Sequence, residues 1–241
     1  MAANNKAITY HYKFRFNDGT EKELKVKLDR KTLNLLHGER DTYPEWATLN
    51  FFKCPNCTLS EDLHKFCPIA KNFTDIVESF GNSISYEEVA VSVITEEREY
   101  FKHTTLQKAL SSLTGIYMVT SGCPVMDKLR PMVRHHLPFA SEEETKYRAL
   151  SMYLLAQYFL YKRGIEPDLD MKNLARIYEE VQIVNKAFHK RLSNIKMEDA
   201  NVNALVILNC FAGCVTFSIN KEMMEEIELL FAAYLPDGKP V

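Results

Sequence analysis

The chain has 241 residues, of which 46% are hydrophobic and 26% are charged, and it contains only eight glycines. This composition is typical of a folded globular protein and excludes a fibrous chain or one that is disordered throughout. The formal net charge of −2 gives no electrostatic footprint for nucleic acid, so we do not expect a nucleic-acid partner. The chain does not open on a basic segment followed by an apolar one, and it has no apolar run long enough to cross a bilayer, so we expect a cytoplasmic protein with no membrane contact.

The first hundred residues carry the signals of an antiparallel sheet. Apolar residues alternate with polar ones over residues 8–16, a turn sequence follows at 17–20, and alternation resumes at Leu24, Val26 and Leu28. This pattern predicts a β-hairpin over residues 7–29. We expect a third strand at 47–52 and a fourth around Val91.

One helix is predicted between the third and fourth strands. Apolar residues recur at helical spacing from Ile69 to Phe80, with Pro68 at the start and Gly81 just past the end. We expect this helix to pack on the sheet. Residues 1–103 then form an α+β lobe that also holds a cysteine-rich loop.

Helical patterns replace strand patterns after residue 103. Thr104 is a predicted N-cap, Ser141 and Glu144 form a capping box, and Asp170 and Asp199 are predicted to begin two further helices. In the capping-box helix one stripe is apolar or aromatic: Tyr147, Leu150, Leu154, Tyr158 and Tyr161. We therefore predict an all-α helical bundle over residues 104–241, and an α+β fold for the whole chain.

Cysteines followed by proline are the strongest chemical signal in the sequence. They occur at Cys54, Cys67 and Cys123, and Cys57 completes a Cys54-Pro-Asn-Cys57 turn. A thiol just ahead of a helix start faces unpaired N–H groups, which favour its thiolate for metal binding or nucleophilic chemistry.

These four cysteines predict a thiolate metal site. Cys54, Cys57 and Cys67 come from one short loop, and Cys123 is the expected fourth ligand, with His64 as the local competitor. The Cys54–Cys57 turn resembles the metal-binding knuckle of zinc ribbons and rubredoxin-like sites, although Thr58 follows it and the other cysteines are single. Zinc is the favoured metal and an iron–sulfur cluster is the alternative. The site would join the two lobes in a protein with a binding or regulatory role.

A different function class remains open from the same residues. In a thiol-dependent enzyme or redox sensor, Cys123 or the Cys54/Cys57 pair would react, and His135 or His136 would serve Cys123 as base. The plain alternative is that the cysteines are buried, reduced thiols. The amphipathic helices are also compatible with a homo-oligomer or a protein partner.

Overall fold

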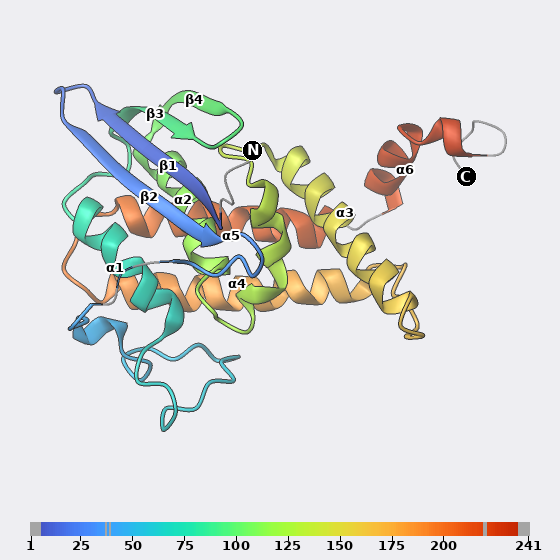
Figure 1. Cartoon of the computed structure of the whole chain (residues 1–241), viewed down its shortest axis with the longest axis horizontal. Helices are drawn as coiled ribbons and strands as arrows, with labels where there is room; N and C mark the ends of the chain where they lie inside the picture. The colour runs from blue at the N-terminus through green and yellow to red at the C-terminus, as the bar shows by residue number, and fades with distance from the viewer. Residues whose placement is uncertain (1–5, 37, 39, 219–220, 236–241) are drawn as a thin grey trace.

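The computed structural model describes residues 6–36, 38, 40–218 and 221–235, and it confirms the predicted α+β class (Figure 1). Four antiparallel strands form one sheet in the order β2-β1-β3-β4. Their bounds are β1 Ala7–Phe16, β2 Glu21–Asp29, β3 Glu88–Ile94 and β4 Glu99–Thr105. The predicted hairpin of residues 7–29 is therefore confirmed.

Alternation in the strands gives the sheet one buried face. Tyr10, Tyr12 and Phe14 of β1 are buried, and Tyr12 stands between Leu24 of β2 and Val93 of β3. Side chains on the opposite face of β1, such as Lys13, are exposed. The buried face is the one that the helices cover.

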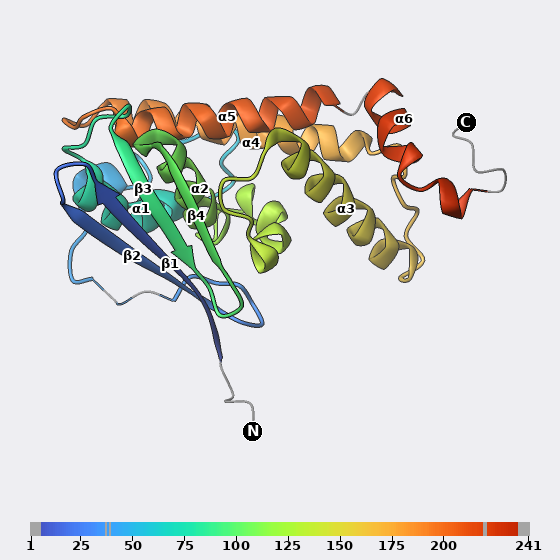
Figure 2. The ribbon, with the colours of Figure 1, turned by 90° about the horizontal axis from the view of Figure 1, so that it is seen from above.

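Helices form two layers behind the sheet (Figure 2). The helices are α1 Pro68–Phe80, α2 Leu106–Val119, α3 Glu142–Tyr161, α4 Lys172–Ser193, α5 Ala200–Ser218 and α6 Lys221–Leu229, with 3-10 segments η1 Glu45–Ala47, η2 Met126–His135 and η3 Ala232–Tyr234. Helices α1 and α2 lie against the sheet, α4 and α5 pack behind them, and α6 lies apart beyond α3. None of the helices in the described part of the chain combines the length and the apolar character needed to cross a membrane.

Helix α3 begins as predicted but packs on a different face. The Ser141 hydroxyl accepts from the N–H of Glu144, and the Glu144 carboxylate accepts from the N–H of Ser141. Of the predicted stripe only Leu150 is buried, whereas Tyr147, Leu154, Tyr158 and Tyr161 are exposed. The residues that α3 buries are Ala149, Leu150, Tyr153 and Gln157.

Two strand predictions differ from the structure. Residues 47–52 do not form a strand: Ala47 ends η1, Thr48 makes an isolated bridge with Phe66, and residues 49–52 form a turn and a bend. Strand β4 was not predicted, and it leads directly into α2 at Leu106, one residue after the Thr105 N-cap. The division into lobes at residues 103 and 104 stays a prediction.

Candidate functional site

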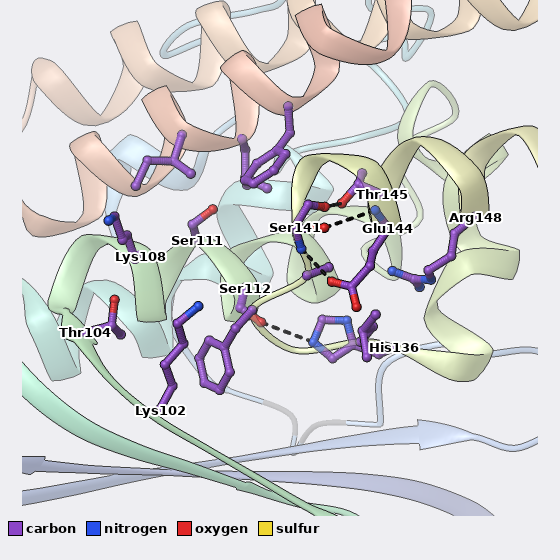
Figure 3. Close-up of a pocket in the computed structure, with 16 residues that line it drawn as sticks. Lys102, Thr104, Lys108, Ser111, Ser112, His136, Ser141, Glu144, Thr145 and Arg148 are labelled. Carbon is purple, nitrogen blue, oxygen red and sulfur yellow. Dashed lines mark hydrogen bonds between the residues drawn. The ribbon is translucent and has the colours of Figure 1, made fainter. Parts of the chain in front are cut away.

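The largest hollow that we consider, the outer cavity, has a volume of about 620 Å³ (Figure 3). It lies between β4, α2, the segment 136–141, the first turns of α3, and α5. Its polar lining consists of Lys102, Thr104, Lys108, Ser111, Ser112, His136, Ser141, Glu144, Thr145 and Arg148. Its apolar lining consists of Leu137, Phe139, Ala140, Ile207, Leu208 and Phe211. Pockets with an apolar wall and a few convergent polar groups are the usual form of a small-molecule site.

Positive charge predominates in the outer cavity. Three different elements supply cations, with Lys102 on β4, Lys108 on α2 and Arg148 on α3. Within the described residues none of the three forms an ion pair. The carboxylate in the lining, Glu144, is bonded to the N–H of Ser141 (Figure 3). The cavity therefore favours an anion.

Arg148 is the most constrained of these cations. Its side chain is half-buried, and Nη2 donates to the carbonyl oxygens of Met132 at 2.8 Å and of His135 at 3.1 Å. Carbonyls hold the guanidinium in place but do not neutralise it. Burial lowers the pKa of Arg148, the expected effect on a cation removed from water without a carboxylate partner.

His136 lies beside Arg148 in a network of neutral groups. Its Nε2 is 2.7 Å from the hydroxyl of Tyr12 and 3.3 Å from Oγ of Ser112, and these two oxygens are 3.0 Å apart. Burial, together with the charge of Arg148, lowers the pKa of His136 to about 3. Burial also raises the pKa of Tyr12. At neutral pH the imidazole is therefore uncharged, and its Nε2 shares hydrogen bonds with the hydroxyls of Tyr12 and Ser112.

The segment between His136 and α3 carries strained backbone at the cavity. Phe139, which lines the apolar wall, has a φ of 59°. A left-handed conformation costs a bulky residue about 1–3 kcal/mol and is found mostly where the surroundings impose it. Such strain is frequent at binding sites, so it supports the same region.

Three hollows meet at Arg148 and His136. Both residues line the outer cavity, a rear cavity of about 520 Å³ at the end of the sheet, and an inner chamber of about 150 Å³. The rear cavity is bounded by Tyr10, Tyr100 and Arg98, among others. The inner chamber lies between α2, η2, α4 and α5. An anion bound at Arg148 would therefore lie next to all three hollows.

This arrangement suits binding better than acid–base catalysis. Ser112 and His136 resemble a nucleophile and its base, but a histidine with a pKa of about 3 is a weak base at neutral pH. No described carboxylate accepts a hydrogen bond from its ring, so the third member of a catalytic triad is not present among the described residues.

The four predicted site cysteines lie elsewhere. Cys54, Cys57, Cys67 and Cys123 all line one small cavity of about 20 Å³, the cysteine cavity, between the loop after η1, the start of α1, and α4. Arg191 also lines it, and donates to the carbonyls of Trp46, Thr48, Leu49 and Phe52. Burial raises the pKa of Cys54 to about 12 and also raises the pKa of Cys67 and Cys123.

A protein-family model described as "Domain of unknown function (DUF6901)" matches residues 8–232. The chain belongs to this family. No curated protein and no solved structure matches the chain. The matched range contains every residue of the outer cavity and of the cysteine cavity, so both belong to the domain that defines this family.

The predicted metal-binding function is wrong. In the described ranges there is no group of three or more His, Cys, Asp or Glu side chains that could hold a metal ion. Burial raises the pKa of Cys54, Cys67 and Cys123 and so favours their neutral thiols, whereas metal ligands are thiolates. A zinc or iron–sulfur site joining two lobes, with Cys123 or His64 as fourth ligand, is therefore not supported.

The structure also gives no support to the alternative of a thiol-dependent enzyme in which Cys123 reacts with His136 as its base. Cys123 lines the cysteine cavity, whereas His136 lines the outer cavity, so the structure does not bring this thiol and this base together at one site. The raised pKa of Cys123 also opposes a reactive thiolate.

The sequence did not reveal the residues of the outer cavity as a set. His136 was considered, but as a partner for Cys123, and Arg148, Lys102 and Lys108 were not singled out. One local signal was present, because Arg148 directly precedes Ala149 and Leu150 on the buried side of α3. Arginines are mostly exposed and are almost never fully buried unless they are paired.

Proposed function

We propose that this protein binds a small organic anion in the outer cavity, with the anionic group on Arg148 and the apolar body against α5. The observation that carries the proposal is the half-buried guanidinium of Arg148, which has two carbonyl partners and no carboxylate. A planar guanidinium offers five donors and matches a carboxylate or a phosphate in a bidentate pair.

Other groups at the cavity support the same ligand class. Lys102 and Lys108 add positive charge at the mouth, and Ser111 is a buried serine whose hydroxyl has no partner among the described residues. Ile207, Leu208 and Phe211 provide an apolar wall. A ligand with one anionic end and one apolar end would satisfy both sides of the cavity.

The cytoplasm is the proposed location, and the free state of the cysteines supports it. All six are free thiols, as reducing compartments keep them. A homo-oligomer or a protein partner stays a prediction.

The test is titration calorimetry of the full chain with four ligands that share one eight-carbon chain: the carboxylate, the phosphate monoester, the primary amide and the alcohol. We expect one or both anions to bind at least about tenfold more tightly than the neutral compounds, as charge-assisted hydrogen bonds imply. The stronger anion identifies the ligand group. Equal binding of anionic and neutral compounds, or no binding of any, would refute the proposal.

A further inference from the structure

The inner chamber adjoins the outer cavity and lies between α2, η2, α4 and α5. The two hollows share Arg148, His136, Thr145, Leu208 and Phe211. A ligand whose anionic group lies on Arg148 therefore has the chamber within reach of its apolar end. The following inference rests on the proposed function and extends it to the structure of the ligand.

The size and lining of the chamber suit an apolar group. Its volume is about 150 Å³, and much of its wall consists of aliphatic residues such as Ile116, Val119, Leu129 and Val181. A protein cavity of about this size, lined by aliphatic and aromatic side chains, accepts a molecule as large as benzene. A hydrocarbon chain or a ring would fill it.

One polar atom in the chamber has no partner. Asn185 of α4 lines the chamber and is 2% exposed, and its buried Oδ1 has no hydrogen-bond partner among the described residues. Leaving a buried amide oxygen unpaired is unfavourable, and most such groups in folded proteins are paired. The chamber that Asn185 lines is the space from which a ligand can supply a partner for this amide.

Tyr178 shows how Asn185 lies relative to Arg148. The Tyr178 hydroxyl donates to the sulfur of Met132 at 3.6 Å, and the carbonyl of Met132 accepts from Arg148. Tyr178 thus stands at the Arg148 end of the chamber. Asn185 follows it by seven residues, which is about two turns or 10 Å along α4. An apolar stretch of wall therefore separates the cation from the unpaired amide.

We infer that the ligand is a hydroxylated organic acid, whose anionic group binds Arg148 and whose apolar chain crosses the chamber to a hydroxyl on Asn185. A hydroxyl is the expected group because it is small and uncharged and both donates and accepts, so it pairs with either end of the Asn185 amide. This ligand provides the hydrogen bond that the buried amide otherwise lacks.

The test compares unsubstituted alkanoates of about six to twelve carbons with their terminal hydroxy counterparts, by titration calorimetry of the full chain. We expect the wild-type protein to bind the hydroxy acid about fivefold more tightly than the plain acid at one preferred length. Asn185→Leu, of similar size, should remove this preference and leave the plain acid bound at least as well. Asn194→Leu, which changes an exposed amide at the end of α4, should keep the preference.

Three results would overturn the inference in distinguishable ways. If plain acids bind and hydroxy acids bind no better at any length, the hydroxyl contact is wrong while the proposed function stands. If the preference persists in Asn185→Leu, Asn185 is not its source. If no acid of either series binds, the proposed function fails and this inference fails with it. The chain-length dependence in the wild-type protein does not rely on any variant that might fold poorly.

Discussion

The Arg148 guanidinium and the His136 imidazole line the same three hollows, and they differ in charge at neutral pH. The pKa of His136 is lowered to about 3 by burial and by the charge of Arg148, whereas an arginine keeps its proton. Of these two residues, Arg148 therefore carries the positive charge. His136 contributes as a neutral hydrogen-bond partner of the Tyr12 hydroxyl.

Acid should destabilise the protein partly through His136. The pKa of His136 in the folded protein lies below the ordinary histidine value of about 6.5. The stability that the neutral imidazole contributes is therefore fully present above pH 6.5 and is lost as the pH falls toward 3. His136→Gln has no proton to gain over this range. We expect its urea midpoint to fall less between pH 7 and pH 4 than that of the wild-type protein, whereas His103→Gln, at an exposed position, should follow the wild-type curve. Parallel curves for all three proteins would contradict the lowered pKa.

Arg191 should be essential for the loop after η1. It is 1% exposed, and its guanidinium donates to the carbonyls of Trp46, Thr48, Leu49 and Phe52. We expect Arg191→Met to lower the free energy of unfolding by about 3–5 kcal/mol because it leaves these carbonyls unpaired. The neighbouring exposed Lys190→Met should change it by less than about 0.5 kcal/mol. Chemical denaturation measures both, and a small effect at Arg191 would show that other groups hold this loop.

The same arginine explains why residues 47–52 do not form the strand that the sequence predicts. Their apolar alternation is real, but a side chain about 140 positions later takes their carbonyls in place of a neighbouring strand. By contrast, local signals fixed α1 between Pro68 and Gly81 and α3 at Ser141. Strand β4 escaped prediction because it is an edge strand with mostly exposed residues and little alternation.

Long-range contacts also explain why the site was missed. Lys102, Lys108 and Arg148 share a cavity only because β4, α2 and α3 converge there, and no spacing in the sequence records that. Cys54, Cys57, Cys67 and Cys123 line one small cavity, but in the described part of the chain they do not form a group that could hold a metal ion. Their chemistry was misjudged, because burial raises the pKa of Cys54, Cys67 and Cys123 and the sequence does not report burial.

Asp168, not the predicted Asp170, should cap α4. Its carboxylate accepts from the N–H groups of Lys172 and Asn173 and from the hydroxyl of Tyr153. Asp170 makes only an exposed ion pair with Lys172. We expect Asp168→Ala to cost about 1–2 kcal/mol of unfolding free energy and Asp170→Ala less than about 0.5 kcal/mol. Thermal unfolding of the two variants measures the difference, and the reverse order would restore Asp170 as the cap.

The cysteines should differ sharply in their reaction with iodoacetamide. Cys210 is exposed, whereas burial raises the pKa of Cys54, Cys67 and Cys123. Only thiolates react, so at pH 7.5 we expect Cys210 to be labelled at least about tenfold faster than these three thiols in the native protein. Mass spectrometry of peptides over time reads each site. Rapid labelling of Cys123 would revive the view that it is a reactive thiol.

The most direct test of the account is the effect of Arg148→Met on binding of the anion selected from the eight-carbon series. Arg163→Met is the matched control, because Arg163 also donates only to a backbone carbonyl, near the other end of α3, and lies outside the outer cavity. Lys108→Met, at an exposed position, provides a second variant if loss of the Arg148 hydrogen bonds impairs folding. We predict that calorimetry will show at least about a tenfold loss of affinity for Arg148→Met, a smaller loss for Lys108→Met and none for Arg163→Met. Wild-type affinity in a folded Arg148→Met protein would contradict the central claim that Arg148 holds the ligand.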